Sequence, residues 1–184
     1  MLIELPEPCL VVLVGAAGAG KSSLAARLFA PDQVLSSDAT RALLTGNEAD
    51  QAVTKTAFAI LHRQLARRMA ERRTTVVDAT NVTSFARRSL VRRATAQGVP
   101  AVAIILDLAP PLVLARNTTR SGRIVPEDAV RRQLADLARS LRRGDLDTDG
   151  FTAVHHLRTA DELDSVAVSV AHPAADADPR AEPT

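Results

Sequence analysis

The chain has 184 residues, of which 46% are hydrophobic and 24% are charged, proportions that suit one domain with a proper hydrophobic core. No apolar run approaches the roughly 20 residues of a membrane helix, and the first residues lack the pattern of a signal peptide. A soluble, cytoplasmic protein that contacts no membrane is therefore expected. The single cysteine, Cys9, excludes an internal disulfide and a cysteine-rich metal site.

The charge is nearly balanced, with 23 basic and 21 acidic residues, but only two basic residues, Lys21 and Lys55, are lysines. Arginine binds phosphate oxygens through its planar fork and keeps its charge, which favours phosphate-rich partners. Most of the arginines, including adjacent pairs such as Arg87 and Arg88, are nevertheless expected on solvated helix faces. Aromatic residues make up 2% of the chain, which argues against a base-stacking platform.

The predicted elements alternate along the chain. The first is a buried apolar strand at 10–14, which ends at a glycine-rich turn. It is followed by a helix at 21–29, a strand at 33–36, helices at 38–44 and 50–72, a strand at 74–77, a helix at 83–97, a strand at 101–106, a helix at 111–120, a helix opening at Pro126, a strand at 151–157 and a helix at 160–170. Five strands alternating with helices predict an α/β fold with a five-stranded parallel sheet covered on both faces. Residues 1–170 are expected to form the domain, and residues 171–184, rich in Ala, Pro and Asp, to be disordered.

A phosphate-binding motif follows the first strand. The segment from Gly15 to Ser22 fits the pattern G-x-x-x-x-G-K-S between a buried strand and a helix. Its backbone N–H groups and the helix N-terminus would hold the phosphates of ATP or another NTP. Lys21 would reach the outer phosphates, and Ser22 would ligate Mg²⁺. The predicted NTP-binding residues of this segment are Gly15, Gly18, Ala19, Gly20, Lys21, Ser22 and Ser23.

Two further polar segments follow strands and should reach the same edge of the sheet. In the first, Asp38 would accept the proton of an attacking hydroxyl, and Arg41 would hold an acceptor phosphate. The alternative is that Asp38 or Ser37 only caps the short helix.

The second segment runs from Asp78 to Asn81. Asp78 would hold magnesium through water or pair with Arg41, while Thr80 and Asn81 would hydrogen-bond an acceptor. The alternative is again a helix cap, for which Thr83 is a nearer candidate. Spacing alone leaves open whether Asp38 or Asp78 is the base, and which of them assists the metal through water.

An arginine-rich segment is predicted to cover the nucleotide. Arg116 and Arg120 lie four residues apart on one helix face, and Arg123 follows Gly122. Such a lid would bring guanidinium charge to the outer phosphates of the NTP and exclude water. The alternative is an ordinary solvated helix end.

Together these motifs resemble P-loop polynucleotide 5′-kinases, most closely the kinase module of bacterial polynucleotide kinase-phosphatases of RNA repair. The resemblance covers residues from about 9 to about 170 and implies an adenylate-kinase-like phosphotransferase with an arginine lid. It implies Mg²⁺-dependent transfer of the γ-phosphate of an NTP to the 5′-hydroxyl end of RNA or DNA. The phosphatase and ligase-like domains that often accompany that module have no counterpart in these residues, so a free-standing kinase or a fragment is expected.

The resemblance also implies residue roles. Asp38 would be the general base, Arg41 would grip the phosphate beside the terminal nucleotide, and Arg116 and Arg123 would clamp the donor. The implied catalytic residues are Asp38, Lys21 and Arg123. Gln51 and Gln64 would line the acceptor groove.

Two other functions stay open. One is a P-loop kinase of a small molecule or of a tRNA-linked hydroxyl, because such kinases share the framework. The other is a non-catalytic NTP-binding regulatory module. A GTPase is disfavoured because the chain has no Asn-Lys-x-Asp element. The choice between RNA and DNA, the donor base and the oligomeric state are not determined by the sequence.

Overall fold

The centre of the molecule is a five-stranded parallel sheet. The computed structural model describes residues 1–45, 54–119 and 124–171. The strand order is β3 (Val34–Ser36), β4 (Thr75–Asp78), β2 (Leu10–Val14), β5 (Ala101–Leu106) and β6 (Ala153–Leu157). Every residue of β2 and β5 is buried, as expected for parallel strands covered on both faces. The predicted α/β fold with five parallel strands is confirmed.

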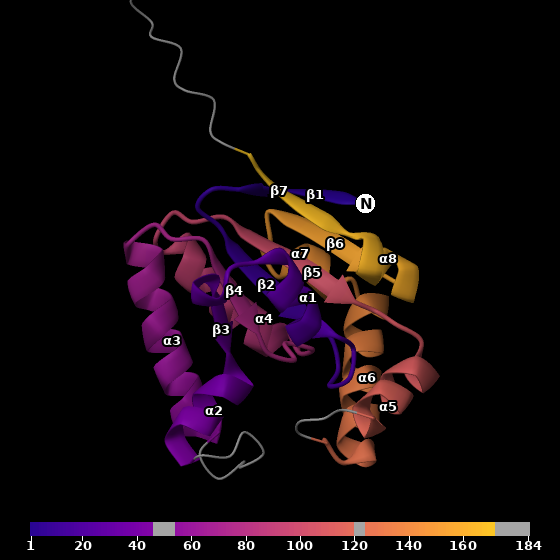
Figure 1. The fold of residues 1–184 in the computed structure, drawn as a ribbon. Coiled ribbons are helices and arrows are strands. Elements are labelled where there is room, and N and C mark those ends of the chain that lie inside the picture. Colours follow the sequence, from indigo (N-terminus) through magenta and orange to yellow (C-terminus); the bar gives the residue numbers. More distant parts are fainter. Residues whose placement is uncertain (46–53, 120–123, 172–184) are drawn as a thin grey trace, which may run out of the picture.

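Helices pack on both faces of this sheet (Figure 1). Alternate residues of β2 point to opposite faces, because side chains alternate along a strand. Val11 and Leu13 pack with α1 (Lys21–Leu28) and α8 (Ala160–Ser165), whereas Val12 packs with α3 (Thr54–Ala70) and α4 (Ser84–Thr95). The remaining helical segments are η1 (Pro31–Gln33), α2 (Ser37–Thr45), α5 (Pro110–Thr118), α6 (Glu127–Arg142) and α7 (Asp145–Thr148). No helix within the described ranges is both long enough and apolar enough to cross a membrane.

Two strands were not predicted. β1 (Leu2–Pro6) pairs in parallel with β7 (Ala167–Ala171) in a separate two-stranded sheet. The helix predicted at 160–170 is therefore wrong beyond Ser165, where α8 ends. Alternation in β1 buries Ile3 and Leu5 and exposes Leu2 and Glu4, but a strand this short gains most of its stability from a partner distant in sequence. The predicted disordered tail at 171–184 lies outside the described residues except for Ala171, which ends β7.

Arg87 corrects the expectation that the paired arginines cover solvated faces. Its side chain is fully buried in α4, and its Nε donates to the Asp149 carboxylate at 2.6 Å. Its Nη1 donates to the carbonyl oxygens of Asn81 and Val82 at 3.1 and 2.8 Å, and its Nη2 donates to Ser140 Oγ at 2.6 Å. One guanidinium thus connects α4 and α6 to the loop that follows β4. A buried charge is tolerated here because it is fully paired.

Candidate active site

The predicted phosphate loop connects β2 to the N-terminus of α1. The Gly15 N–H donates to the Thr80 carbonyl oxygen at 2.9 Å, which joins the loop to the segment after β4. Gly18 and Gly20 have φ values of +86° and +97°, a region that favours glycine. Glycine at these two positions therefore lets the loop adopt a backbone conformation that residues with a Cβ atom disfavour.

Two helices close tightly on this loop. A Cβ atom at Gly18 would lie 2.4 Å from the Val113 carbonyl oxygen of α5, and one at Gly20 would lie 3.0 Å from Leu163 Cδ2 of α8. Gly18 thus combines a left-handed φ with an approach to backbone that leaves no space for a side chain. The glycines have a packing role in addition to their conformational one.

The side chains that open α1 are held by the loop and by β4. Lys21 is 8% exposed, and its Nζ donates to the Ala16 carbonyl oxygen at 2.9 Å, so the ammonium stays beside the loop. Ser22 Oγ donates to Asp78 Oδ2 at 2.7 Å. Because the Ser22 hydroxyl donates its hydrogen bond to Asp78, the lone pairs of the hydroxyl oxygen remain available to a cation. Hydroxyl and carboxylate oxygens are the ligands that Mg²⁺ prefers, so this pair fits the predicted metal.

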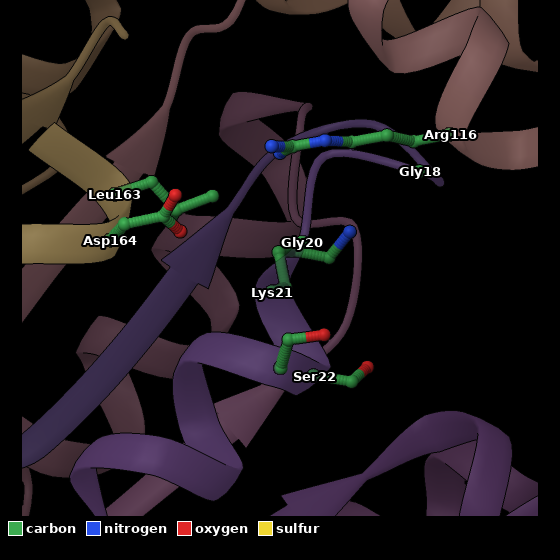
Figure 2. A pocket seen from close by; sticks show the side chains of 8 residues that line it. Gly18, Gly20, Lys21, Ser22, Arg116, Leu163 and Asp164 are labelled. Atoms are coloured by element: carbon green, nitrogen blue, oxygen red, sulfur yellow. The ribbon is translucent and has the colours of Figure 1, made fainter. Parts of the chain in front are cut away.

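A first hollow of about 350 Å³ lies over the loop (Figure 2). It is lined by Gly18, Gly20, Lys21, Ser22, Ser23, Arg116, Leu163 and Asp164. In Figure 2 the Arg116 side chain extends across the loop, and the two residues of α8 lie on the other side of it. The hollow thus combines the phosphate loop, a guanidinium from α5 and part of the C-terminal helix.

A second hollow of about 250 Å³ adjoins the same loop. It is lined by Ala17, Lys21, Ser22, Ser37, Asp38, Arg41, Phe58, Asp78, Ala79, Thr80, Val125, Ala129 and Gln133. We call the first the donor hollow and the second the acceptor hollow. Lys21 and Ser22 line both, so the two hollows meet at the start of α1.

Asp38 and Arg41 form an ion pair at the wall of the acceptor hollow. The Arg41 side chain is 6% exposed, whereas that of Asp38 is 30% exposed. The helix cap is supplied by another residue, since Ser36 Oγ accepts the Ala39 N–H at 3.3 Å. For the helix after β4, Thr83 Oγ1 accepts the Ala86 N–H, as the sequence suggested.

Some predicted site residues lie elsewhere. Asn81 is buried, and its Nδ2 donates to the carbonyl oxygens of Leu13 and Ala79, so it supports the loop and lines neither hollow. Gln64 is exposed and lines a separate hollow beside Arg67. The acceptor contacts of Asn81 and Gln64 stay predictions from the sequence. Three predicted residues lie outside the described part of the chain: Gln51, Arg120 and Arg123.

Two polar residues near the site were not predicted. Gln133 of α6 accepts the Ala17 N–H through Oε1 at 2.8 Å and lines the acceptor hollow. Asn117 of α5 is buried and exchanges two hydrogen bonds with the backbone of Val125, at 2.8 and 3.2 Å. These contacts attach α6 and the segment before it to the phosphate loop and to α5. No sequence motif marks either residue, because each partner is identified only by the folded chain.

Cys9, His62, His155 and His156 line neither hollow. Burial raises the pKa of the Cys9 thiol to about 11, so the thiol stays protonated near neutral pH. His155 Nε2 and His156 Nδ1 are buried and have no hydrogen-bond partner in the described residues. Burial lowers the pKa of both rings below the ordinary value of 6.5.

The parallel sheet and the phosphate loop between β2 and α1 define a P-loop kinase-like α/β protein. A family profile described as an AAA domain matches residues 10–143. The chain therefore belongs to this AAA-domain family. Comparison with curated protein sequences gives no match.

Solved structures share this fold at low sequence identity. The Pnkp1/Rnl/Hen1 RNA repair complex matches with a TM-score of 0.65 and 20% identity, over 76% of this chain and 47% of the other. A complex of AvrRxo1-ORF1 and ORF2 with ATP matches with a TM-score of 0.68 and 15% identity, over 84% and 55%. A gluconokinase from Sinorhizobium meliloti 1021 matches with a TM-score of 0.52 and 20% identity, over 87% of each chain. The chain spans about half the length of the first two.

Proposed function

We propose that this protein transfers the γ-phosphate of ATP or another NTP, with Mg²⁺, to the 5′-hydroxyl end of RNA or DNA. The observation that carries the proposal is that the donor and acceptor hollows meet at Lys21 and Ser22. Asp38 and Arg41 line the acceptor hollow together with Lys21 and Ser22. A phosphoryl group held by the loop would therefore face a hydroxyl held beside a carboxylate.

On the donor side, the loop N–H groups and the start of α1 would bind the phosphates. Lys21 would exchange its bond with the Ala16 carbonyl for the outer phosphates, and Arg116, which lines the donor hollow, would add a second cation. Preorganised cations of this kind stabilise the charge that spreads over the transferred group. Arg120 and Arg123 are proposed for the same role from the sequence alone.

Mg²⁺ would be held by Ser22, with Asp78 orienting the serine hydroxyl through the 2.7 Å hydrogen bond. When bound, the ion would neutralise negative charge on the donor phosphates. Magnesium sites in such proteins use few protein ligands and leave other positions to water and phosphate, which agrees with one hydroxyl and one carboxylate at this point.

On the acceptor side, Asp38 would accept the proton of the attacking hydroxyl. The hydroxyl oxygen forms a bond to the γ-phosphorus, the bond from that phosphorus to the bridging oxygen breaks, and the NDP leaves. Arg41 pairs with Asp38 in the structure, and its buried guanidinium would also hold an anion of the acceptor. A phosphodiester beside a 5′-hydroxyl offers such an anion.

The polynucleotide acceptor is supported by the fold shared with a component of an RNA repair complex. The competing acceptor is a small hydroxyl compound, which the similarity to a gluconokinase over 87% of each chain favours. Both acceptors suit a carboxylate beside an arginine.

The test is incubation of the protein with labelled NTP, Mg²⁺ and 5′-hydroxyl or 5′-phosphate oligonucleotides of RNA and DNA, with gluconate as the small acceptor. Label is expected on 5′-hydroxyl ends alone. Asp38→Asn should lower kcat about 10²–10⁴-fold and leave NTP affinity in place, whereas the exposed Asp161→Asn in α8 serves as the matched control. Transfer only to gluconate would reject the polynucleotide acceptor. Tight NTP binding without transfer to any acceptor would favour a regulatory module.

A further inference from the structure

Gln133 lines the acceptor hollow. It lies in α6, a helix that contains none of the motifs identified in the sequence. Its side chain contacts the phosphate loop, where Oε1 accepts the Ala17 N–H at 2.8 Å. It shares the hollow with Asp38, Arg41 and Asp78. We propose that Gln133 is an acceptor-binding residue, whose amide nitrogen donates to an anionic oxygen of the acceptor beside the attacked phosphate. This inference rests on the proposed function.

The contact with Ala17 determines how the amide group is oriented. A backbone N–H is a donor, so its partner on the glutamine must be the carbonyl oxygen rather than the NH₂ group. The Nε2 atom then lies on the other side of the planar amide. Within the described residues Nε2 makes no hydrogen bond. Two donors of Gln133 are thus available at the wall of the acceptor hollow.

The contact is also compatible with a bound nucleotide. Ala17 and Gln133 line the acceptor hollow but not the donor hollow, whereas Gly18 and Gly20 of the same loop line the donor hollow. The hydrogen bond from the Ala17 N–H to Gln133 therefore joins two residues that both line the acceptor hollow. An NTP in the donor hollow would leave the bond between Ala17 and Gln133 in place, so the amide would stay oriented while the acceptor binds.

The charges in the acceptor hollow explain why a neutral donor suits this position. Asp38 and Asp78 bring two carboxylates there, against the cations of Arg41 and Lys21. An acceptor that carries a phosphate or carboxylate needs hydrogen-bond donors near those carboxylates, and hydrogen bonds to charged groups are stronger than neutral ones. An amide supplies two donors, and its oxygen simultaneously holds the loop.

Two substitutions separate acceptor binding from support of the loop. Gln133→Glu keeps an oxygen that accepts the Ala17 N–H, but it removes both donors and adds negative charge. Gln133→Ala removes the donors and the loop contact together. Gln97→Glu, at an exposed position after α4, adds the same charge away from the hollows and is the matched control.

The experiment measures kcat and KM for the 5′-hydroxyl oligonucleotide, NTP affinity by calorimetry, and hydrogen exchange of the Ala17 amide. We expect Gln133→Glu to raise the acceptor KM about 10- to 100-fold, with NTP affinity and Ala17 protection within about twofold of the wild type. Gln133→Ala should raise the acceptor KM similarly and also lose Ala17 protection. Gln97→Glu should match the wild type.

Two results would overturn the inference. One is Gln133→Glu with a wild-type acceptor KM, and the other is Gln133→Ala that weakens NTP and acceptor equally, as expected for loop support alone. If the wild type phosphorylates gluconate and no oligonucleotide, the proposed polynucleotide function fails separately. The same KM comparison is then made with gluconate, whose carboxylate would take the place of the phosphate, and an unchanged KM in Gln133→Glu again overturns the inference.

Discussion

The buried ion pair between Arg87 and Asp149 makes a prediction that links stability to the site. Replacing Arg87 with Met would remove the guanidinium from Asp149, from Ser140 and from two backbone carbonyls of the loop after β4. The carboxylate of Asp149, which is 1% exposed, would then be buried without its cation. Breaking one partner of a buried pair costs about 3–5 kcal/mol.

The measurement is urea unfolding at 25 °C, supported by the melting temperature. For a chain of this length, 1 kcal/mol corresponds to about 2–4 °C, so Arg87→Met should lower the melting temperature by about 6–20 °C. Arg88→Met is the matched control, because the neighbouring arginine is exposed and should change stability by at most about 0.5 kcal/mol.

A double variant tests the physical reason. Arg87→Met with Asp149→Leu removes the unpaired carboxylate and should recover part of the lost stability, because replacing both charges by apolar groups is often neutral or stabilising. The folded Arg87→Met protein should also lose kcat, because the loop that Arg87 anchors directly follows Asp78, the last residue of β4. The reasoning is refuted if Arg87→Met is within about 1 kcal/mol of the wild type, or if the double variant is less stable than the single one.

Three further predictions follow from the loop, the metal position and β6. Gly18→Ala should destabilise the protein by at least about 1–2 kcal/mol and weaken NTP binding in calorimetry. Gly98 also has a positive φ but open space around it, so Gly98→Ala should keep wild-type NTP affinity. An equal loss of NTP affinity in both variants would contradict the packing argument. Asp78→Asn should raise the Mg²⁺ concentration for half-maximal activity about 10- to 100-fold, and an unchanged magnesium titration would exclude the proposed role. Burial holds the pKa of His155 and His156 below 6.5 in the folded protein, so the unfolded chain takes up protons first and the melting temperature should fall as pH drops from 7.5 to 5.5. Replacing both histidines by Gln should make the melting temperature less dependent on pH. An equally steep fall of the melting temperature in that variant would refute the attribution of the pH dependence to His155 and His156.

Much of the framework was predictable because its signals are local. The strand at 101–106 was predicted with its observed bounds, since strands buried on both sides read as continuous apolar runs. The motif from Gly15 to Ser22 predicted a loop between a strand and a helix, because all of its residues are adjacent in the sequence. Asp38 and Arg41 are three residues apart, and one turn of α2 brings them together.

What the sequence by itself determined is therefore the set of groups within one or two turns of each other: the phosphate loop, the strand cores, and the carboxylate beside its arginine. Only the tertiary structure decided which distant groups meet these. Gln133 contacts Ala17 of the phosphate loop, 116 residues away in the sequence. Arg87 is buried rather than solvated, and β1 pairs with β7 from the other end of the domain. Such contacts depend on how the helices and strands pack together, and a short-range pattern of residue types carries no information about the partner that packing will supply.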